Sequence, residues 1–140
     1  MKPIDVHLWE EFIEQHPAFY EWCEYDVLVG NGVIAGDVEA DPYAKSFQML
    51  TQKKIDVVAY KGDAITIIEV KPLSGSAALG QLIGYKKLWH EANPDIDPAK
   101  VSMALITNLP QSDFAKIYQD LGIQLYEVGI CDKCSGNLQI

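Results

Sequence analysis

The most constraining feature of the sequence is a pair of short apolar segments, residues 55–60 and 64–70, which are separated by a Gly62-Asp63 turn signal. Both segments are rich in β-branched residues, and a glycine–aspartate pair between such segments is typical of a tight β-hairpin. If Gly62 and Asp63 form the turn, the numbers of paired residues sum to 125. The pattern therefore predicts two antiparallel strands in a fixed register.

This register places Asp56 directly opposite Glu69, and period-two alternation puts Lys71 on the same face, together with Val58 and Ile67. Opposed residues have β-carbons about 4.5 to 5.5 Å apart, so a sheet built only for stability avoids two acids there. A divalent cation removes the conflict, because Mg²⁺ accepts one or two carboxylates together with water and phosphate oxygens.

Lys71 completes a set of groups suited to metal-assisted phosphodiester hydrolysis. Its ammonium can orient or deprotonate the attacking water, or stabilise charge on the phosphate. The backbone carbonyl of Val70, between the two side chains, is a candidate further metal ligand. The alternative is a surface patch in which Lys71 only bridges two acids. A Glu-x-Lys fragment is expected roughly once by chance in this composition, but charges within apolar strands require a reason, which favours the catalytic interpretation.

Residues 55–62 (IDVVAYKG) and 67–71 (IIEVK) resemble the core motif of the PD-(D/E)XK nuclease superfamily, closest to its Holliday-junction-resolvase-like and RecB-like branches. Ile55 stands where the motif often has proline. Gln81 and Tyr85 match the Gln-Leu-x-x-Tyr motif that RecB-like nucleases carry on the following helix. They are four residues apart and share a helix face.

The resemblance implies hydrolysis of DNA with Mg²⁺ or Mn²⁺, and a role for Gln81 and Tyr85 in ordering the site. It also implies a metal-ligating glutamate on the first helix, for which Glu10 lies nearest the apolar arc and Glu14 is the alternative. The iron–sulfur cluster of some RecB-like relatives needs four cysteines, and this chain has three.

The remaining pattern predicts an α/β fold with a restriction-endonuclease-like core, a mixed sheet flanked by helices in the order αβββαβαβ, within one domain spanning residues 1–140. Asp5 is the expected N-cap of the first helix, and the three tryptophans, Trp9, Trp22 and Trp89, are expected in the core. Helices are expected at 5–16, 44–50, 76–92 and 111–121, and strands at 19–29, 55–60, 64–70, 100–107 and 123–128.

The charge balance argues against a protein that reads DNA sequence. The chain carries a net charge of −9, its 11 basic residues are all lysines, and arginine, the usual bidentate partner of phosphate and guanine, is absent. Four lysines near the motif form a candidate phosphate-contacting rim, with simple solvation as the alternative: Lys53, Lys54, Lys86 and Lys87. Structure-selective, single-strand or end-directed cutting fits this charge better than base readout.

Three alternatives remain open on function and assembly. The domain is a nuclease acting on DNA, a non-catalytic module of the same fold that binds nucleic acid or protein, or the nuclease subunit of a larger recombination or replication complex. A homodimer is compatible with each. Zinc at Cys131 and Cys134 is not expected, because no second ligand pair exists. The absence of a secretory signal and of a long apolar segment predicts a cytoplasmic protein.

Overall fold

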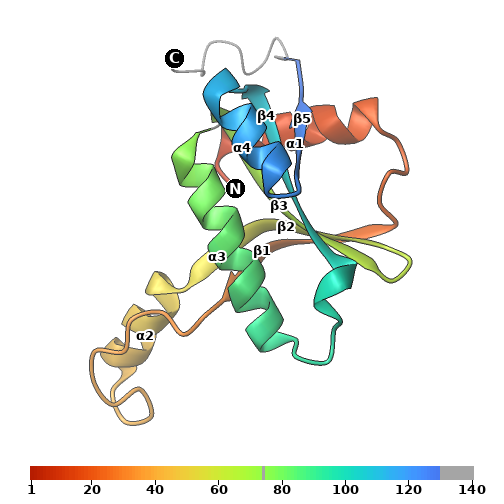
Figure 1. Cartoon of the computed structure of the whole chain (residues 1–140). Coiled ribbons are helices and arrows are strands. Elements are labelled where there is room, and N and C mark those ends of the chain that lie inside the picture. The colour runs from red at the N-terminus through yellow and green to blue at the C-terminus, as the bar shows by residue number, and fades with distance from the viewer. Residues whose placement is uncertain (74, 130–140) are drawn as a thin grey trace.

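The computed structural model describes residues 1–73 and 75–129 and shows a mixed five-stranded sheet flanked by helices (Figure 1). Its elements are, in chain order, α1 (Pro3–Gln15), β1 (Trp22–Val29), α2 (Pro42–Thr51), β2 (Lys53–Lys61), β3 (Ala64–Leu73), α3 (Ser76–Ala92), a short 3₁₀ helix (Pro98–Lys100), β4 (Val101–Leu109), α4 (Ser112–Asp120) and β5 (Ile123–Glu127). The predicted α/β order is confirmed, and α3 has the predicted bounds.

The strands lie in sequence order, β1-β2-β3-β4-β5. The first three strands are antiparallel, and β4 and β5 then add in parallel to β3. Helices α3 and α4 supply the connections that such parallel neighbours need. Because β3 is central and buried on both faces, residues 67–70 are continuously buried.

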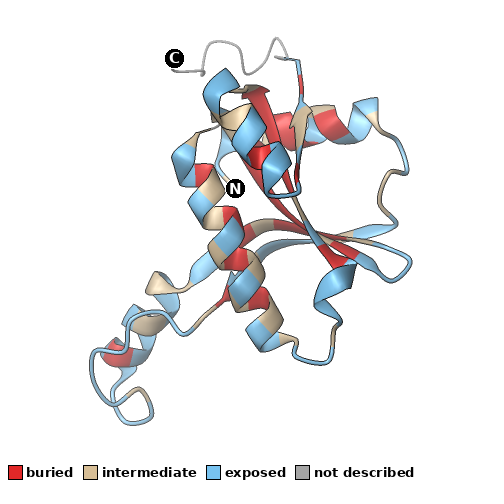
Figure 2. Ribbon diagram, in the orientation of Figure 1, coloured by how far each residue is buried: buried red, intermediate tan, exposed pale blue. Residues whose placement is uncertain are grey.

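Helices cover both faces of the sheet, so the protein has two apolar layers (Figures 1 and 2). On one face, Leu8 and Phe12 of α1 pack with Val57 and Ile68 of the sheet. On the other face α3 contributes the buried side chains of Ala78, Leu82, Tyr85 and Trp89, which pack against the sheet and Tyr118 of α4. The 3.6-residue periodicity of the two helices produces these single apolar stripes.

The first helix begins earlier than predicted, and Asp5 lies within its first turn and is not its N-cap. Pro3 is the first helical residue and Lys2 is the N-cap, so the prediction of Asp5 as N-cap was wrong. Proline is favoured at this first position because its missing N–H has no partner there in any helix. Asp5 instead lies inside the first turn, where its Oδ2 accepts the Lys2 backbone N–H at 3.0 Å.

Trp22 also departs from expectation. Trp9 and Trp89 are buried, whereas Trp22 is 54% exposed at the start of β1, which begins three residues later than predicted. The Trp22 ring stacks on Tyr60 of β2 with centroids 3.9 Å apart and an interplanar angle of 4°. The two residues are paired across the strands, so cross-strand stacking replaces burial in the core.

Residues 30–52 project from the body of the molecule (Figure 1). They comprise the loop after β1 and helix α2, and the side-chain amide of Gln52 donates to the Gly30 carbonyl at 2.9 Å across the base of this arm. Ala44 is the only buried residue of α2. Across the described residues, none of the helices combines the length and apolar composition needed to cross a bilayer.

Candidate functional site

The predicted hairpin register is confirmed. Paired positions of β2 and β3 run from Lys61–Ala64 to Val57–Ile68, which all sum to 125. At the next position, side chains bridge the two strands. The Asp56 backbone N–H donates to Glu69 Oε1 at 3.2 Å, and the Val70 N–H donates to Asp56 Oδ2 at 2.9 Å. Each carboxylate is therefore held by the backbone of the opposite strand.

Strand β2 changes face at Asp56, which the regular alternation did not predict. Ile55 and Val57 should share a face, yet Val57 packs in the α1 layer and Ile55 packs in the α3 layer with Val58. The facing residue of β1, Asp26, has a left-handed φ of 50° between the regular pairs Tyr25–Val57 and Val27–Ile55. Because of this local kink, the alternation of side chains along β2 is interrupted at Asp56, and Asp56 does not simply extend the face that carries Val58.

Burial dominates the electrostatics of the two acids. Glu69 is 2% exposed, and burial, followed by the charge of Asp56, raises its pKa to about 8. Burial also raises the pKa of Asp56, an effect that the Val70 N–H partly offsets. Without a cation, the pair would retain a proton near neutral pH, because two adjacent buried carboxylates cannot both ionise freely.

Lys71 supplies the positive charge nearest Glu69. Its Nζ lies 4.0 Å from Glu69 Oε2, and its side chain is 34% exposed, whereas that of Glu69 is 3% exposed. The charge of Lys71 lowers the pKa of both acids, but less than burial raises it. The partly exposed ammonium therefore stands between the buried carboxylate of Glu69 and solvent.

The structure brings Tyr85 of α3 toward the acids. Tyr85 is 8% exposed, and burial, followed by the charges of Glu69 and Asp56, raises its pKa. One helical turn earlier, Gln81 has a buried Oε1 with no hydrogen-bond partner. A buried acceptor without a partner is costly, so Gln81 is suited to an additional donor such as water or a substrate group.

A cavity of about 280 Å³ adjoins these residues of α3. It is lined by Lys53, Gly80, Gln81, Gly84, Tyr85 and Leu88. No atom lies within 4 Å of where a β-carbon would stand on Gly80 or Gly84, so the helix surface is bare there. Of the four rim lysines, Lys53 lines the cavity, Lys54 and Lys87 are exposed, and Lys86 is half-buried.

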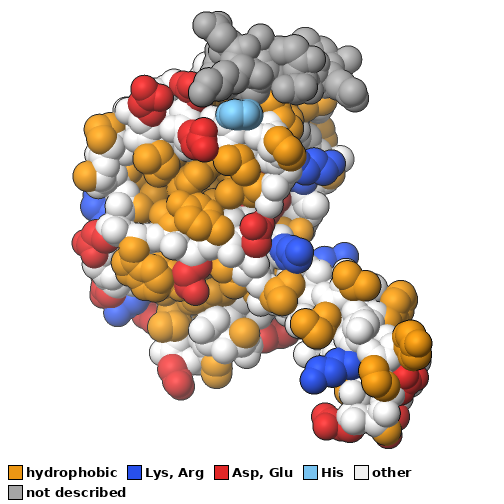
Figure 3. Space-filling view, turned by 180° about the vertical axis from the view of Figure 1, so that it is seen from behind, with side chains coloured by type: hydrophobic (Ala, Val, Ile, Leu, Met, Phe, Trp, Pro, Cys, Tyr) orange, Lys and Arg blue, Asp and Glu red, His pale blue; other side chains and the backbone are white. Residues whose placement is uncertain are grey.

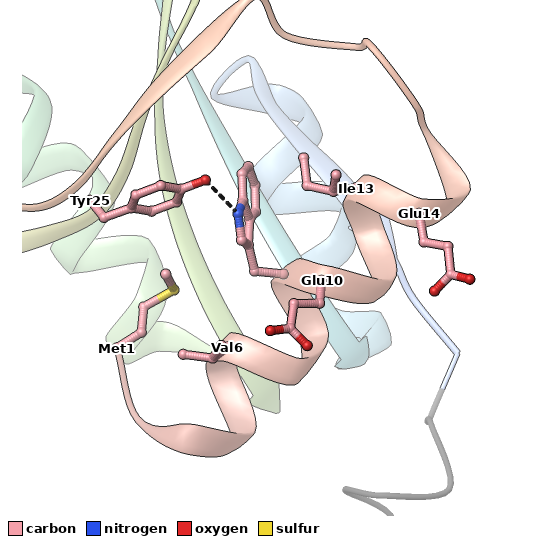
Figure 4. A pocket seen from close by; sticks show the side chains of 7 residues that line it. Met1, Val6, Glu10, Ile13, Glu14 and Tyr25 are labelled. Atoms are coloured by element: carbon pink, nitrogen blue, oxygen red, sulfur yellow. Dashed lines mark hydrogen bonds between the residues drawn. The ribbon is translucent and has the colours of Figure 1, made fainter.

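Glu10 and Glu14 lie at a different hollow, of about 520 Å³, between α1 and β1 (Figure 4). The Glu10 side chain is 66% exposed and lies 3.7 Å from His7. The acid of α1 whose charge reaches this site is Asp5, which is 8% exposed and raises the pKa of Asp56. Sequence reasoning missed Asp5, although Pro3 at the first helical position was a signal for an earlier helix start.

A divalent cation fits the chemistry of the two carboxylates, because its charge would favour the ionised form of both acids, whose pKa values burial raises. Among the described residues, no group of three or more histidine, cysteine and acidic side chains could hold a metal ion. The protein ligands would be Asp56 and Glu69, with the Val70 carbonyl and water completing the shell. Cys131 and Cys134 lie outside the described residues.

The sequence matches no protein-family model, and no curated protein matches it. Solved structures do match over most of the chain. A complex of EndoMS with double-stranded DNA has a TM-score of 0.50 and 17% identity, over 89% of this chain and 44% of that one. A repair endonuclease from Pyrococcus abyssi has a TM-score of 0.52 and 14% identity, over 89% and 46%.

A protein of unknown function gives a TM-score of 0.54 and 18% identity, over 87% of this chain and 55% of that one. The chain therefore spans about half the length of the structures it matches. At such identities the likeness concerns the backbone and not the activity. It shows that this chain has the mixed-sheet α/β fold of these endonucleases, the restriction-endonuclease-like architecture expected from its sequence.

Proposed function

We propose that this chain is a metal-dependent deoxyribonuclease that hydrolyses DNA phosphodiester bonds, and that residues 1–140 form a single nuclease domain. The observation that carries the proposal is the buried Glu69 beside the half-buried Asp56, each accepting a backbone N–H of the opposite strand, with the ammonium of Lys71 at 4.0 Å from Glu69. A structural role alone does not account for the pair, since an isosteric apolar pair would fold at lower cost.

Asp56 and Glu69 would hold Mg²⁺ or Mn²⁺, which supplies charge neutralisation at the phosphate and a lowered pKa of water. Lys71, at the solvent side of the pair, would orient the attacking water and stabilise negative charge on the phosphate oxygens. Because its side chain is partly exposed, it can reach a phosphate without disrupting the sheet.

Residues of α3 would position the substrate. The phenol of Tyr85 lies near the acids, and the unpartnered Oε1 of Gln81 is suited to accept a hydrogen bond from the ordered water. Lys53 lines the same cavity and is exposed, so it would contact the phosphate backbone beside the scissile bond. We assign Lys54, Lys86 and Lys87 to the outer rim of this contact.

The net charge of −9 and the absence of arginine favour a second candidate, a non-catalytic binding module of the same fold. Both candidates share the scaffold, but only the nuclease requires the three charged groups together. The same charge is compatible with an enzyme that binds the DNA phosphate backbone weakly. Such an enzyme would recognise DNA shape, or would obtain its affinity from the partners of a recombination complex.

Incubation with linear duplex, single-stranded, nicked and four-way-junction DNA in Mn²⁺ tests the proposal. We expect the wild type to cut at least one substrate, and the Lys71→Ala and Asp56→Asn variants to lose the activity. Lys116→Ala is the matched control, since Lys116 is an exposed lysine on α4. Absence of cleavage, together with a melting temperature that Mn²⁺ does not raise, would exclude the enzyme and leave the binding module.

A further inference from the structure

The projecting arm, residues 30–52, carries an apolar surface that the nuclease site does not use. Helix α2 exposes Tyr43 (86%), Phe47 (46%) and Leu50 (83%). These residues are four and three positions apart, so they form one stripe along the helix. In Figure 3, hydrophobic side chains gather along the arm that extends from the body.

One side of α2, next to the stripe, is covered by the arm's own loop. Ala44 is 4% exposed, and the Val33 N–H donates to Thr51 Oγ1 at 2.6 Å. Gly32, with a φ of 64°, lies so close to the Gln48 carbonyl that a side chain would collide with it. The loop therefore fixes the orientation of α2 and leaves the three stripe residues exposed.

An isolated stripe of this kind is rare on a protein surface. Monomeric proteins seldom expose contiguous apolar patches above a few hundred Å², and larger patches mark interaction sites. The three stripe residues together expose about a few hundred Å² of side-chain surface.

The charges beside the stripe favour a second copy of the same chain as the partner. The loop before α2 is acidic, with Asp37, Glu39 and Asp41, and β2 begins directly after α2 with two exposed lysines, Lys53 and Lys54. An antiparallel pair of α2 helices would place the acidic end of each arm over the basic end of the other. The two helix dipoles would also oppose each other favourably.

We propose that the arm is a self-association surface, through which two copies of the chain pair along the Tyr43–Phe47–Leu50 stripe in an antiparallel, two-fold arrangement. The stripe carries no charge, and its centre lies near Phe47, so Phe47 packs against its own copy while Tyr43 meets Leu50. This inference rests on the arm and on Lys53 and Lys54 at the start of β2, and it does not depend on the nuclease function.

Sedimentation equilibrium of the full chain tests the proposal. We expect a dimer with a Kd on the order of micromolar, as for a small interface. Phe47→Glu and Leu50→Glu should each raise the Kd at least about 100-fold, because every substitution occurs twice in a two-fold interface. Met49→Glu is the matched control: Met49 is 53% exposed on the same helix but off the stripe, and its change should leave the Kd within about threefold.

A charge-reversal pair tests the antiparallel geometry. Glu39→Lys and Lys54→Glu should each weaken the dimer, and the double variant should restore it, because the two positions then exchange signs across the interface. Circular dichroism checks that every variant remains folded, which is expected since the arm lies outside both cores. A monomeric wild type at 100 times the expected Kd, a dimer that survives Leu50→Glu, or a double variant without rescue overturns the proposal.

Discussion

Replacing Glu69 by glutamine should make the metal-free protein more stable at neutral pH. Glutamine keeps the size and the Oε1 acceptor that receives the Asp56 N–H, but it cannot ionise. In the folded wild type, burial and Asp56 raise the pKa of Glu69 from 4.5 to about 8. The folded state therefore binds this proton more tightly than the unfolded state does.

The sign and the pH window follow from linkage. For an acid with a raised pKa, the free energy of unfolding falls as pH rises from the unfolded pKa of 4.5 to the folded pKa of about 8. Each pH unit in that window costs about 1.4 kcal/mol, so the loss reaches about 3 kcal/mol at pH 7 and about 5 kcal/mol above pH 8. At pH 7 the melting temperature of Glu69→Gln should exceed that of the wild type by about 10 °C.

Urea unfolding in EDTA, from pH 4.5 to 8.5, measures the difference in the free energy of unfolding between Glu69→Gln and the wild type. This difference should be small at pH 4.5 and increase through the window, and Mn²⁺ should reduce it by binding only the wild type. Glu91→Gln is the control, since Glu91 is exposed near the end of α3 and should shift no curve. Parallel curves for the wild type and Glu69→Gln, within about 0.5 kcal/mol throughout, would refute the buried-pair reasoning.

Three further substitutions probe other parts of the molecule. Lys71→Met removes the ammonium but keeps an apolar stem, so cleavage should fall at least about 100-fold while Mn²⁺ still raises the melting temperature; equal activity contradicts its role. Phe12→Ala leaves a cavity at a fully buried position of α1 and should lower the free energy of unfolding, measured in urea, by about 3 to 5 kcal/mol. Gly32→Ala should release α2 from its loop and speed proteolytic cleavage of the arm about tenfold, with the melting temperature within about 2 °C; unchanged proteolysis would show that the loop tolerates a side chain.

Much of the candidate site was predictable because it is encoded locally. Turn chemistry at Gly62-Asp63 and period-two alternation fix which residues of two adjacent strands meet, and the observed register agrees. Helix α3 was equally predictable, because its start after Gly75 and its end before Pro94 are set by local signals, and the observed bounds agree. Gln81 and Tyr85 were predicted from the resemblance of this helix to a Gln-Leu-x-x-Tyr motif, and their spacing of four residues places them on one helix face.

Other features depend on segments that meet only in the folded chain. The left-handed conformation of Asp26 in β1 and the change of face at Asp56 in β2 arise together where the strands pair, and neither segment shows the kink alone. Trp22 is as apolar as Trp9 and Trp89, yet its strand position places it at the surface against Tyr60. Burial is a property of the packed layers and not of the residue type.

The sequence alone determined the pairing of β2 with β3 from Lys61–Ala64 to Val57–Ile68, because hydrogen-bond register and side-chain alternation act between neighbouring segments. Only the tertiary structure decided that the charge of Asp5 reaches Asp56 while Glu10 lines a separate hollow, and that α2 stands away from both cores. Those outcomes depend on how α1 packs across the sheet and on how the loop before α2 folds onto it. Such contacts join distant segments, whose proximity no local pattern records.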